Sequence, residues 1–391
     1  MNTLAAWNLE LTGTVLFWAG ILSCAWTFVL YPAFIHLLAR TRPPPAAPVP
    51  RYERGELPSA TVIICAHNEE SRIRARIENL LLSEYPEGRL DILVVSDGST
   101  DSTAQVVRSM DHDNVQVLER PEKSGKPACL NAAAEQAAGE VIVFADARQT
   151  FAPDAIHNLV RHFKDPAVGA VSGQLFPHAS KGGAAQGIDF YWKLEKSLRH
   201  AEAQLDSCIG CTGAVYALRR TSYKSLPTDT LLDDVVLPMR AAQSGLRILF
   251  DPDARAYDPQ KLDPAQEKTR KARTLAGNFQ MLFRHAGWLM PWKSRLWWKL
   301  ASHKYSRLLT PFSLAAALAG AWLAQGVFLY QLAFWAQALL YALAAAGLIF
   351  RGLRTPLLTI PAGFLFLAWM VVRGFLYYVS GRYKSGWDKS G

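Results

Sequence analysis

The chain has 391 residues, of which 50% are hydrophobic and 19% are charged, so it is long enough for more than one folding unit. Its formal net charge is +9, but the basic residues cluster beside long uncharged segments and not in a separate basic domain. This distribution argues against nucleic-acid binding and favours contact with a lipid bilayer. The five cysteines, with one isolated C-x-x-C, match neither a disulfide framework nor a zinc site.

Three segments contain no Lys, Arg, Asp or Glu: residues 11–38, 308–350 and 355–372. A helix needs about 20 apolar residues to cross a bilayer, so these segments predict one, two and one crossings. The first could instead be a secretory signal, but it is longer than an apolar signal region of about 7–15 residues and has no small-residue cleavage site. We therefore expect a multi-pass protein of the bacterial inner membrane, with its soluble domain in the cytoplasm because basic residues flank the spans on that side.

The composition predicts six consecutive parts: a transmembrane helix over 1–40, a Pro-rich linker over 41–58, an α/β domain over 59–260, amphipathic interfacial helices over 261–307, three transmembrane helices over 308–380 and a tail over 381–391. The interfacial assignment rests on four Trp residues that alternate with Arg and Lys between residues 279 and 300. The tail is basic although this topology places it outside. Either the last apolar segment is not a simple crossing, or the tail tolerates a few basic residues.

The α/β domain opens with two β-rich apolar runs, "ATVIICAH" and "LDILVVSDG", separated by a segment with helical apolar spacing. Further alternation predicts a helix over 102–110, a strand over 115–118, a helix over 126–138 and a strand over 141–144. Strands connected in this way are parallel, and ligands bind beyond their carboxyl ends. Three polar segments follow these ends, at 67–69, 97–99 and 146–148. They predict a single cleft.

Several charged residues near this cleft can take part in chemistry, and each also has a structural explanation. Asp97 can accept hydrogen bonds from a ribose or a base, or it can belong to a capped turn. Lys126, near a helix start, suits a phosphate, but it can also be a solvated lysine. Asp233 and Asp234 begin a predicted helix, where acids commonly stabilise the helix dipole. Because adjacent helical residues point in different directions, one of them can act as a base while the other holds a loop or ligand.

Six segments, in this order and spacing, resemble the family 2 glycosyltransferases of the GT-A fold: "IICAHNEE", "VVSDGSTD", "SGKPACLN", "VFADAR", "GCTGAVYALRR" and "LLDDVVLPMRAAQSG". The likeness covers about residues 59–257. The apolar segments are similar to those of the membrane-embedded branch that includes cellulose, chitin and hyaluronan synthases. The resemblance implies a Rossmann-like, mostly parallel sheet in a cytoplasmic domain that is fused to transmembrane helices.

The resemblance also implies roles for individual residues. Four residues are expected to hold the uridine part of a UDP-sugar: Ala66, Asn68, Glu69 and Asp97. Lys126 would assist nearby, and Asp146, as the first acid of the family's D-x-D element, would bind Mg²⁺ or Mn²⁺ on the pyrophosphate. Asp234 would be the general base that deprotonates the acceptor hydroxyl. Five residues are expected at the acceptor: Gly210, Cys211, Thr212, Gly213 and Asp233.

Two departures from the family pattern bear on this expectation. Arg148 replaces the second acid of D-x-D, which removes one carboxylate from the metal site, although an arginine can itself pair with a phosphate. The Q-x-x-R-W element of the processive synthases has its nearest counterpart at residues 270–274, where only the arginine, Arg273, is kept. Arg273 is expected to reach the pyrophosphate. The missing Trp, which stacks beneath the acceptor sugar in the synthases, argues against long-chain polymerisation.

Together these features predict an enzyme that transfers a sugar from a UDP-sugar, with inversion, to a polysaccharide or a lipid-linked acceptor at the cytoplasmic face of the membrane. Either a single sugar is added or a polymer is extended. A catalytically silent membrane scaffold or sugar-nucleotide sensor is the alternative. The joint presence of Asp97, Asp146 and Asp234 argues against this alternative.

Overall fold

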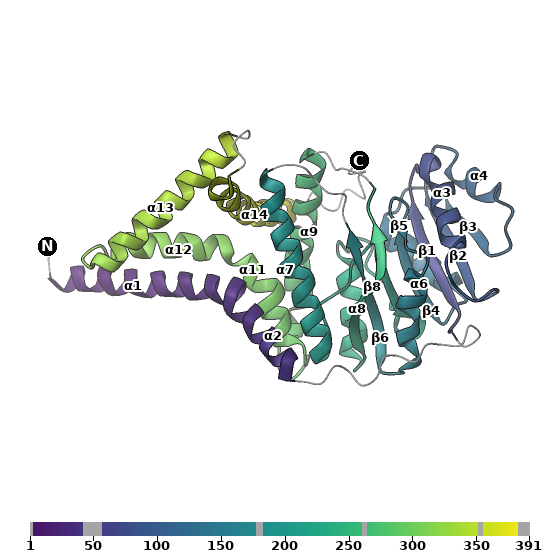
Figure 1. The fold of residues 1–391 in the computed structure, drawn as a ribbon, viewed down its shortest axis with the longest axis horizontal. Coiled ribbons are helices and arrows are strands. Elements are labelled where there is room, and N and C mark those ends of the chain that lie inside the picture. The colour runs from purple at the N-terminus through teal and green to yellow at the C-terminus, as the bar shows by residue number, and fades with distance from the viewer. Residues whose placement is uncertain (1–2, 42–56, 177–182, 260–263, 351–354, 382–391) are drawn as a thin grey trace.

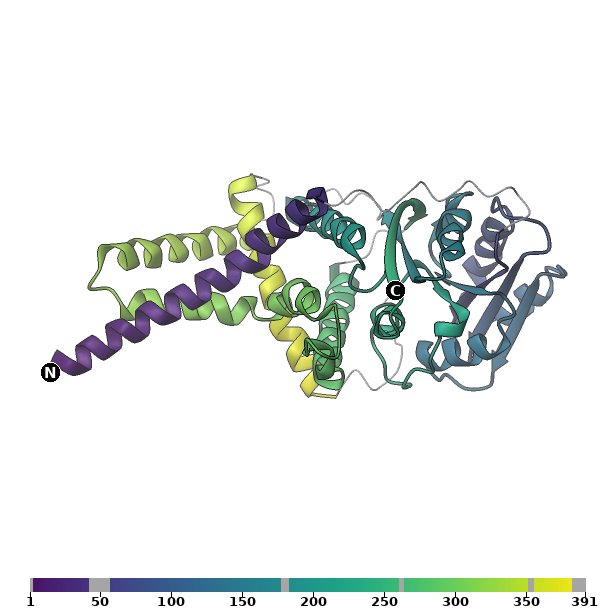
Figure 2. The same ribbon diagram turned by 90° about the horizontal axis from the view of Figure 1, so that it is seen from below.

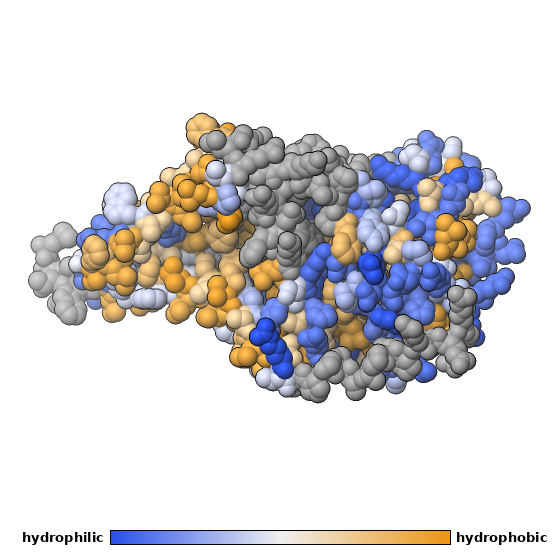
Figure 3. Space-filling view, viewed as in Figure 1, coloured by the Kyte–Doolittle hydropathy of each residue, from blue (hydrophilic) through white to orange (hydrophobic). Residues whose placement is uncertain are grey.

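The computed structural model describes residues 3–41, 57–176, 183–259, 264–350 and 355–381. An α/β domain forms one end of the molecule and a group of apolar helices forms the other, with helices α7 (Gly183–Leu205) and α9 (Pro264–Arg284) between them (Figure 1). Hydrophobic side chains cover the helical end, whereas hydrophilic ones dominate the surface of the α/β domain (Figure 3). The predicted Pro-rich linker and tail fall almost entirely outside the described residues.

The α/β domain is built on one eight-stranded sheet with the order β3-β2-β1-β4-β7-β6-β8-β5. The strands are β1 (Ala60–Ala66), β2 (Leu90–Asp97), β3 (Val115–Arg120), β4 (Val141–Asp146), β5 (Thr150–Phe151), β6 (Val168–Phe176), β7 (Val215–Arg219) and β8 (Arg247–Tyr257). The first four strands are parallel to one another, β7 runs antiparallel to β4 and β6, and β8 runs parallel to β6. The parallel half brings the carboxyl ends of β1, β2 and β4 to one edge, as the alternation predicts.

Helices cover both faces of the sheet. They are α3 (Glu70–Leu81), α4 (Thr103–Arg108), α5 (Lys126–Gln136), α6 (Ala155–Val160), η2 (Arg161–Lys164), α7 (Gly183–Leu205), η3 (Arg220–Ser222) and α8 (Asp233–Gln243). Side chains of β1 alternate between two cores: Ile64 packs with Ile73 of α3, whereas Ile63 packs with Leu130 of α5. Every residue of β1 is buried, which is why the strand reads as a continuous apolar run. The predicted α/β fold class is confirmed.

The remaining elements form the helical end and its junction with the sheet. They are α1 (Thr3–Ala25), η1 (Trp26–Leu30), α2 (Tyr31–Thr41), α9 (Pro264–Arg284), η4 (Ala286–Leu289), α10 (Trp297–Lys299), η5 (Leu300–Tyr305), α11 (Ser306–Leu308), α12 (Thr310–Leu323), α13 (Phe328–Ile349) and α14 (Pro356–Val379). We call α1, α2 and α10–α14, with η1 and η5, the membrane stem. Within the described residues, three segments are long and apolar enough to cross a bilayer: Asn8–Thr41, Phe328–Ile349 and Pro356–Val379.

Helix α12 has 14 residues, which corresponds to about 21 Å of helix, less than the roughly 30 Å of a bilayer core. It packs along α1 through close contacts of small residues; Gly20, for example, meets Ser313 and Ala317. Three crossings between residues 308 and 380 therefore remain a prediction, because two helices among the residues described there have spanning length.

Helix α14 differs in direction from the rest of the membrane stem. It runs across α1, α12 and α13 (Figure 2, yellow) and packs against α9 and α7 at the junction with the sheet. Its most apolar window is 39% buried, compared with 6% for α13. This arrangement favours the interpretation, left open by the sequence, that the last apolar segment is not a simple crossing.

Candidate functional site

The ends of β1 and β2 are tied together by hydrogen bonds between their loops. Asn68 adopts a left-handed conformation, with φ 53°, which asparagine tolerates better than most residues. Its side-chain oxygen accepts a hydrogen bond from the Thr100 N–H at 2.7 Å, and the Glu69 N–H donates to Thr103 Oγ1 at 2.8 Å. Ala66, the last residue of β1, is fully buried. The structure therefore brings three of the expected nucleotide-binding residues together at one sheet edge, and their contact with uridine stays a prediction.

Asp97, the last residue of β2, is buried and faces the loop that precedes α5. Its carboxylate accepts hydrogen bonds from the N–H and the hydroxyl of Ser124, both at 2.7 Å, and from the Gly125 N–H at 2.8 Å. Burial raises the pKa of Asp97, but these hydrogen bonds outweigh it, so the pKa is lowered from its usual value. Asp97 thus fixes the loop that positions Lys126, a role that sequence reasoning missed. Its expected contact with the nucleotide stays a prediction.

Lys126 links the two halves of the site. It begins α5, and its Nζ lies 3.2 Å from Asp146 Oδ1 and 3.6 Å from Asp233 Oδ2. Burial lowers the pKa of this lysine, but the two carboxylates raise it further than burial lowers it. The ammonium group therefore stays charged at neutral pH. It stands where β4 and α8, far apart in the chain, come together.

Asp146 ends β4, and its side chain is 38% exposed. Among the described residues, no group of three or more His, Cys, Asp or Glu side chains could hold a metal ion. Arg148 lies nearby but is directed away, since its Nη2 donates to Asp258 Oδ2 at 2.8 Å. Asp146 alone can hold Mg²⁺ or Mn²⁺ only if substrate and water oxygens complete the shell, and such mixed shells are common for Mg²⁺. The residues present fit a metal site with a single protein carboxylate.

Asp233 and Asp234 begin α8 and do point in different directions. The buried Asp233 lies close to Lys126 and accepts a hydrogen bond from the Tyr216 hydroxyl at 3.4 Å. Asp234 lies against a loop formed by residues 210–213, which we call the glycine loop. The backbone carbonyl of Asp234 accepts a hydrogen bond from the Cys211 N–H at 2.8 Å, and a Cβ on Gly213 would stand 3.0 Å from Asp234 Oδ2. A side chain at position 213 would therefore crowd this carboxylate.

The acidity of Asp234 is unusual. Burial and the neighbouring Asp233 raise its pKa to about 6, against the opposing effect of Lys126, Arg199 and Lys304. A carboxylate with such a pKa is mostly ionised at neutral pH and is a stronger proton acceptor than an ordinary aspartate. This combination suits a general base.

The rest of the glycine loop is fixed by α7, α8 and β6. Gly210 has φ 74°, and a Cβ there would come within 2.9 Å of Val235. The Thr212 N–H donates to Ser172 Oγ at 3.0 Å, and Thr212 Oγ1 accepts from Arg199 Nη1 at 3.1 Å. The four expected acceptor residues of this loop thus lie together beside Asp234. Their contact with an acceptor stays a prediction.

Helix α9 packs against the segment that leads into α8. Gly277 packs so closely that a Cβ there would lie 2.5 Å from Leu232 Cγ. Arg273 lies one turn earlier on the same helical face. The structure therefore places Arg273 on the face that meets the segment leading into α8. Its expected contact with pyrophosphate stays a prediction.

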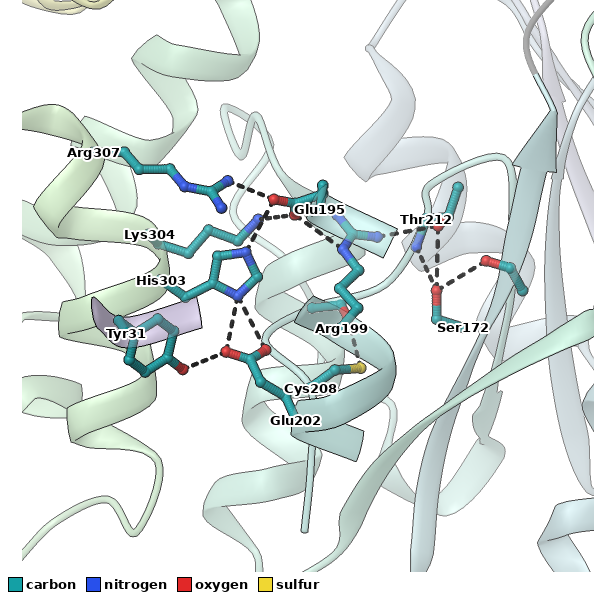
Figure 4. A network of polar contacts seen from close by, with 12 residues as sticks. Tyr31, Ser172, Glu195, Arg199, Glu202, Cys208, Thr212, His303, Lys304 and Arg307 are labelled. Carbon is teal, nitrogen blue, oxygen red and sulfur yellow. Dashed lines mark hydrogen bonds and ion pairs between the residues drawn. The ribbon is translucent and has the colours of Figure 1, made fainter. Parts of the chain in front are cut away.

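Sequence reasoning missed a polar network between α7 and the membrane stem (Figure 4). His303 of η5 lies between two carboxylates, 3.0 Å from Glu202 and 3.0 Å from Glu195. Tyr31 of α2 donates to Glu202 at 2.5 Å, and Arg199 donates to Glu195 at 3.1 Å. The only signal in the sequence was the seven-residue spacing of the two acids, which places them on one helical face.

Comparison with known proteins agrees with this geometry. The model of the family described as Glycosyl transferase family 2 matches residues 61–226. An N-acetylglucosaminyltransferase of Rhizobium sp. (strain N33) is 31% identical over 241 residues, 56% of this chain and 52% of the relative. A poly-beta-1,6-N-acetyl-D-glucosamine synthase of Staphylococcus aureus (strain COL) is 24% identical over 209 residues, 52% of this chain and 50% of the relative. The chain thus spans about half the length of these curated relatives.

Among solved structures, a similar one is the mannosyltransferase PcManGT from Pyrobaculum calidifontis in complex with GDP-Man and Mn²⁺. Its TM-score is 0.69 at 24% identity, and the match covers 95% of this chain and 99% of that one. At this identity the likeness shows the fold alone. Residues 61–226 of this chain thus match the family 2 glycosyltransferase model and have a GT-A-like fold, and this domain is joined to apolar helices long enough to cross a membrane.

Proposed function

We propose that this chain transfers a sugar from a UDP-sugar, with inversion at the anomeric carbon, to a lipid-linked or polysaccharide acceptor at the cytoplasmic face of a bacterial inner membrane. The observation that carries this proposal is the position of Lys126 between Asp146 and Asp233, with the perturbed carboxylate of Asp234 next along α8. A silent scaffold or sensor would not need a carboxylate with a pKa near 6 beside a loop of small residues.

In this proposal each charged residue has one task. Asp234 accepts the proton of the acceptor hydroxyl, and Asp233 holds Lys126 and Tyr216 in place. Lys126 offsets negative charge that builds up on the departing nucleoside diphosphate. Asp146 would hold Mg²⁺ or Mn²⁺, which, when bound, neutralises further charge on the diphosphate.

Inversion needs one base and no covalent intermediate, so a single carboxylate at the acceptor side is sufficient. The absence of the synthase tryptophan near Arg273 supports addition of one sugar, or of a few, over extension of a long polymer. The relatives named above include a polymer synthase, and product length therefore has to be measured.

The donor and product can be tested together. Purified full-length protein in lipid nanodiscs would be given a panel of UDP-sugars, with and without membrane lipid extract, and UDP release and product mass would be recorded. We expect lipid-stimulated UDP release from one donor and a product heavier than the acceptor by one or a few sugars. If no donor in the panel releases nucleoside diphosphate, the scaffold or sensor alternative replaces the proposed enzyme.

A GDP-sugar is the second candidate donor, because PcManGT, which this chain matches over nearly its whole length, was solved with GDP-Man. The same panel therefore includes GDP-mannose and other GDP-sugars. Release of GDP but not UDP would keep the transferase mechanism and overturn the choice of UDP.

Metal dependence is tested by chelation. Among the described residues Asp146 is the carboxylate expected at the ion, and Arg148, which could replace the ion, is paired with Asp258. We therefore expect EDTA to abolish transfer and Mn²⁺ or Mg²⁺ to restore it. Transfer that is unchanged in EDTA would show that basic side chains such as Lys126 replace the ion.

A further inference from the structure

The glycine loop is held from α7 by a charged side chain, that of Arg199. Arg199 Nη1 donates to Thr212 Oγ1 at 3.1 Å, and Ser172 Oγ of β6 lies 3.2 Å from the same oxygen. Figure 4 shows the guanidinium group reaching from α7 to Thr212. The Arg199 side chain is 14% exposed. Because a hydrogen bond from a charged donor is stronger than one between neutral groups, Arg199 can fix the position of the loop.

Arg199 is itself fixed by a carboxylate. Its Nε donates to Glu195 Oε1 at 3.1 Å, and Glu195 in turn contacts His303 at 3.0 Å and Lys304 at 3.6 Å, both of η5. One guanidinium group therefore contacts Glu195 through one nitrogen and Thr212 through another. The planar guanidinium holds its donors in a rigid fork, which the point charge of a lysine cannot reproduce. The direction in which Glu195 holds Arg199 thus affects the position of Thr212.

Thr212 lies between the two residues of the glycine loop that meet Asp234. On one side of it, the Cys211 N–H donates to the Asp234 carbonyl at 2.8 Å. On the other side, a Cβ on Gly213 would stand 3.0 Å from Asp234 Oδ2. A displacement of the loop at Thr212 would therefore change both the backbone contact of Asp234 and the space around its carboxylate.

The charge of Arg199 also acts on Asp234. Burial and Asp233 raise the pKa of Asp234, whereas three cations lower it: Lys126, Arg199 and Lys304. Burial lowers the pKa of Arg199, but Glu195 and Asp234 are among the groups that raise it further, so the guanidinium stays charged at neutral pH. Arg199 therefore favours the ionised form of Asp234, which is the form that can accept a proton.

Arg199 differs from the other two cations in its contacts. Lys126 pairs with Asp146 and Asp233, and Lys304 pairs with Glu195. Of the three, Arg199 is the one for which the structure gives a hydrogen bond to the glycine loop within the described part of the chain.

Two further titratable groups interact with Asp234, those of Tyr216 on β7 and Cys211 in the glycine loop. Burial raises the pKa of each well above its usual value, so both groups stay neutral in the pH range where Asp234 titrates.

We propose that Arg199 is a positioning residue for the acceptor side, which holds the glycine loop against Asp234 and keeps the carboxylate of Asp234 ionised. This inference rests on the proposed function and deepens it, because it names a residue that controls the proposed base without touching the substrates. One side chain exerts both effects, since its guanidinium group bonds to Thr212 and carries the positive charge.

Two variants remove the loop contact and keep the positive charge. Thr212→Val deletes the hydroxyl that accepts from Arg199, and Arg199→Lys deletes the fork. We expect kcat to fall about tenfold in each, with an unchanged KM for the donor. The measurement is the rate of nucleoside diphosphate release by full-length protein in nanodiscs, with the donor and lipid extract that support release by the unaltered protein. Near-normal kcat in both variants would overturn the positioning of the loop by Arg199.

A third variant, Arg199→Gln, removes the charge. The fall of kcat/KM at low pH should then move to higher pH, because a cation that lowers the pKa of Asp234 is lost. Arg199→Lys should keep this fall near its normal pH, which a purely structural role of Arg199 would not produce. Arg220→Gln removes an exposed arginine of η3 and is the matched control, with normal kcat and a normal pH profile. An unmoved pH profile in Arg199→Gln would contradict the effect of its charge on Asp234. If Arg199→Gln does not fold, Thr212→Val and Arg199→Lys still decide whether Arg199 positions the loop.

The outcome is separable from that of the proposed function. Unaltered protein that releases no nucleoside diphosphate from any donor would contradict the transferase, and the role of Arg199 would fall with it. Active unaltered protein, together with Arg199 and Thr212 variants that behave like Arg220→Gln, would contradict the role of Arg199 and leave the transferase standing.

Discussion

The proposed donor side and the proposed acceptor side of the site are built in different ways. The donor side comes from the ends of β1, β2 and β4, which are neighbours in the sheet and lie within residues 60–146. The proposed acceptor side consists of the glycine loop and α8. Arg199 of α7 donates to this loop at Thr212, and Glu195 of α7 pairs with Lys304 of the membrane stem. Parallel strand connection therefore suffices to place the donor residues, whereas the acceptor residues depend on how the membrane stem packs on the domain.

Replacing the proposed base should separate the two sides most sharply. Asp234→Asn keeps the shape of the side chain but cannot accept the proton, so kcat should fall about 10³-fold while the affinity for the donor stays unchanged. Initial rates and donor titration by calorimetry measure the two quantities. Asp113→Asn, an exposed residue near β3, serves as the control. Sugar transfer at a near-normal rate by Asp234→Asn would remove Asp234 from the mechanism.

Lys126 contacts residues of both sides, Asp146 and Asp233. Lys126→Met removes the charge that faces Asp146 and Asp233, and we expect about a 10²-fold loss of transfer together with weaker donor binding. The exposed Lys123→Met is the matched control in the same loop region. If donor affinity is unaffected and only acceptor dependence changes, Lys126 belongs to the acceptor side alone.

The pH dependence of transfer tests whether the ionisation of Asp234 controls the reaction. Asp234 must be ionised to act as a base, so kcat/KM should fall about tenfold per pH unit below a pKa of about 6 and level off above it. The charged groups that act on Asp234 are Asp233, Lys126, Arg199 and Lys304. Because Lys126 lowers this pKa, the acidic limb should move to higher pH in Lys126→Met. If the acidic limb of the pH profile does not move in this variant, the group that titrates there is not Asp234.

The smallest expected effect concerns the joint between α7 and the membrane stem. Tyr31→Phe removes a buried hydrogen bond to Glu202 and should lower the free energy of unfolding by about 1–3 kcal/mol. Denaturant unfolding in detergent measures the change. Tyr330→Phe is the control, since no hydrogen bond of the Tyr330 hydroxyl is found among the described residues. Equal stability of the two variants would show that this contact does not hold the acceptor side to the stem.

Much of the donor side could be predicted from the sequence. Short apolar runs that stop at Asn68, Asp97 and Asp146 predict parallel strands with their polar ends at one edge, and the sheet has them there. The adjacent acids before "VVLPMRAAQSG" likewise predict two different roles, and the structure directs Asp233 to Lys126 and sets Asp234 against the glycine loop. These features follow from local periodicity and from the rules of strand connection.

Other features required the tertiary structure, because the partner of a charged group depends on what packs against it. The sequence does not show that the carboxylate of Asp97 accepts hydrogen bonds from Ser124 and Gly125, or that Arg148 pairs with Asp258. The 24-residue length of α14 suits a crossing, yet its packing on α9 and α7 does not suit a simple one.

The sequence by itself determined the alternation of strands and helices, the three apolar segments and the acids at the sheet edge, since each depends on residues close together in the chain. Only the tertiary structure decided where the basic residues before α12 act. The sequence alone suggests that these residues face lipid. In the structure, however, Lys304 and Arg307 contact Glu195 of α7, about 110 residues earlier in the chain. Folding brings Glu195 and these basic residues together because α7 is packed between the sheet and the membrane stem. A buried carboxylate in this position is stable only with cations beside it.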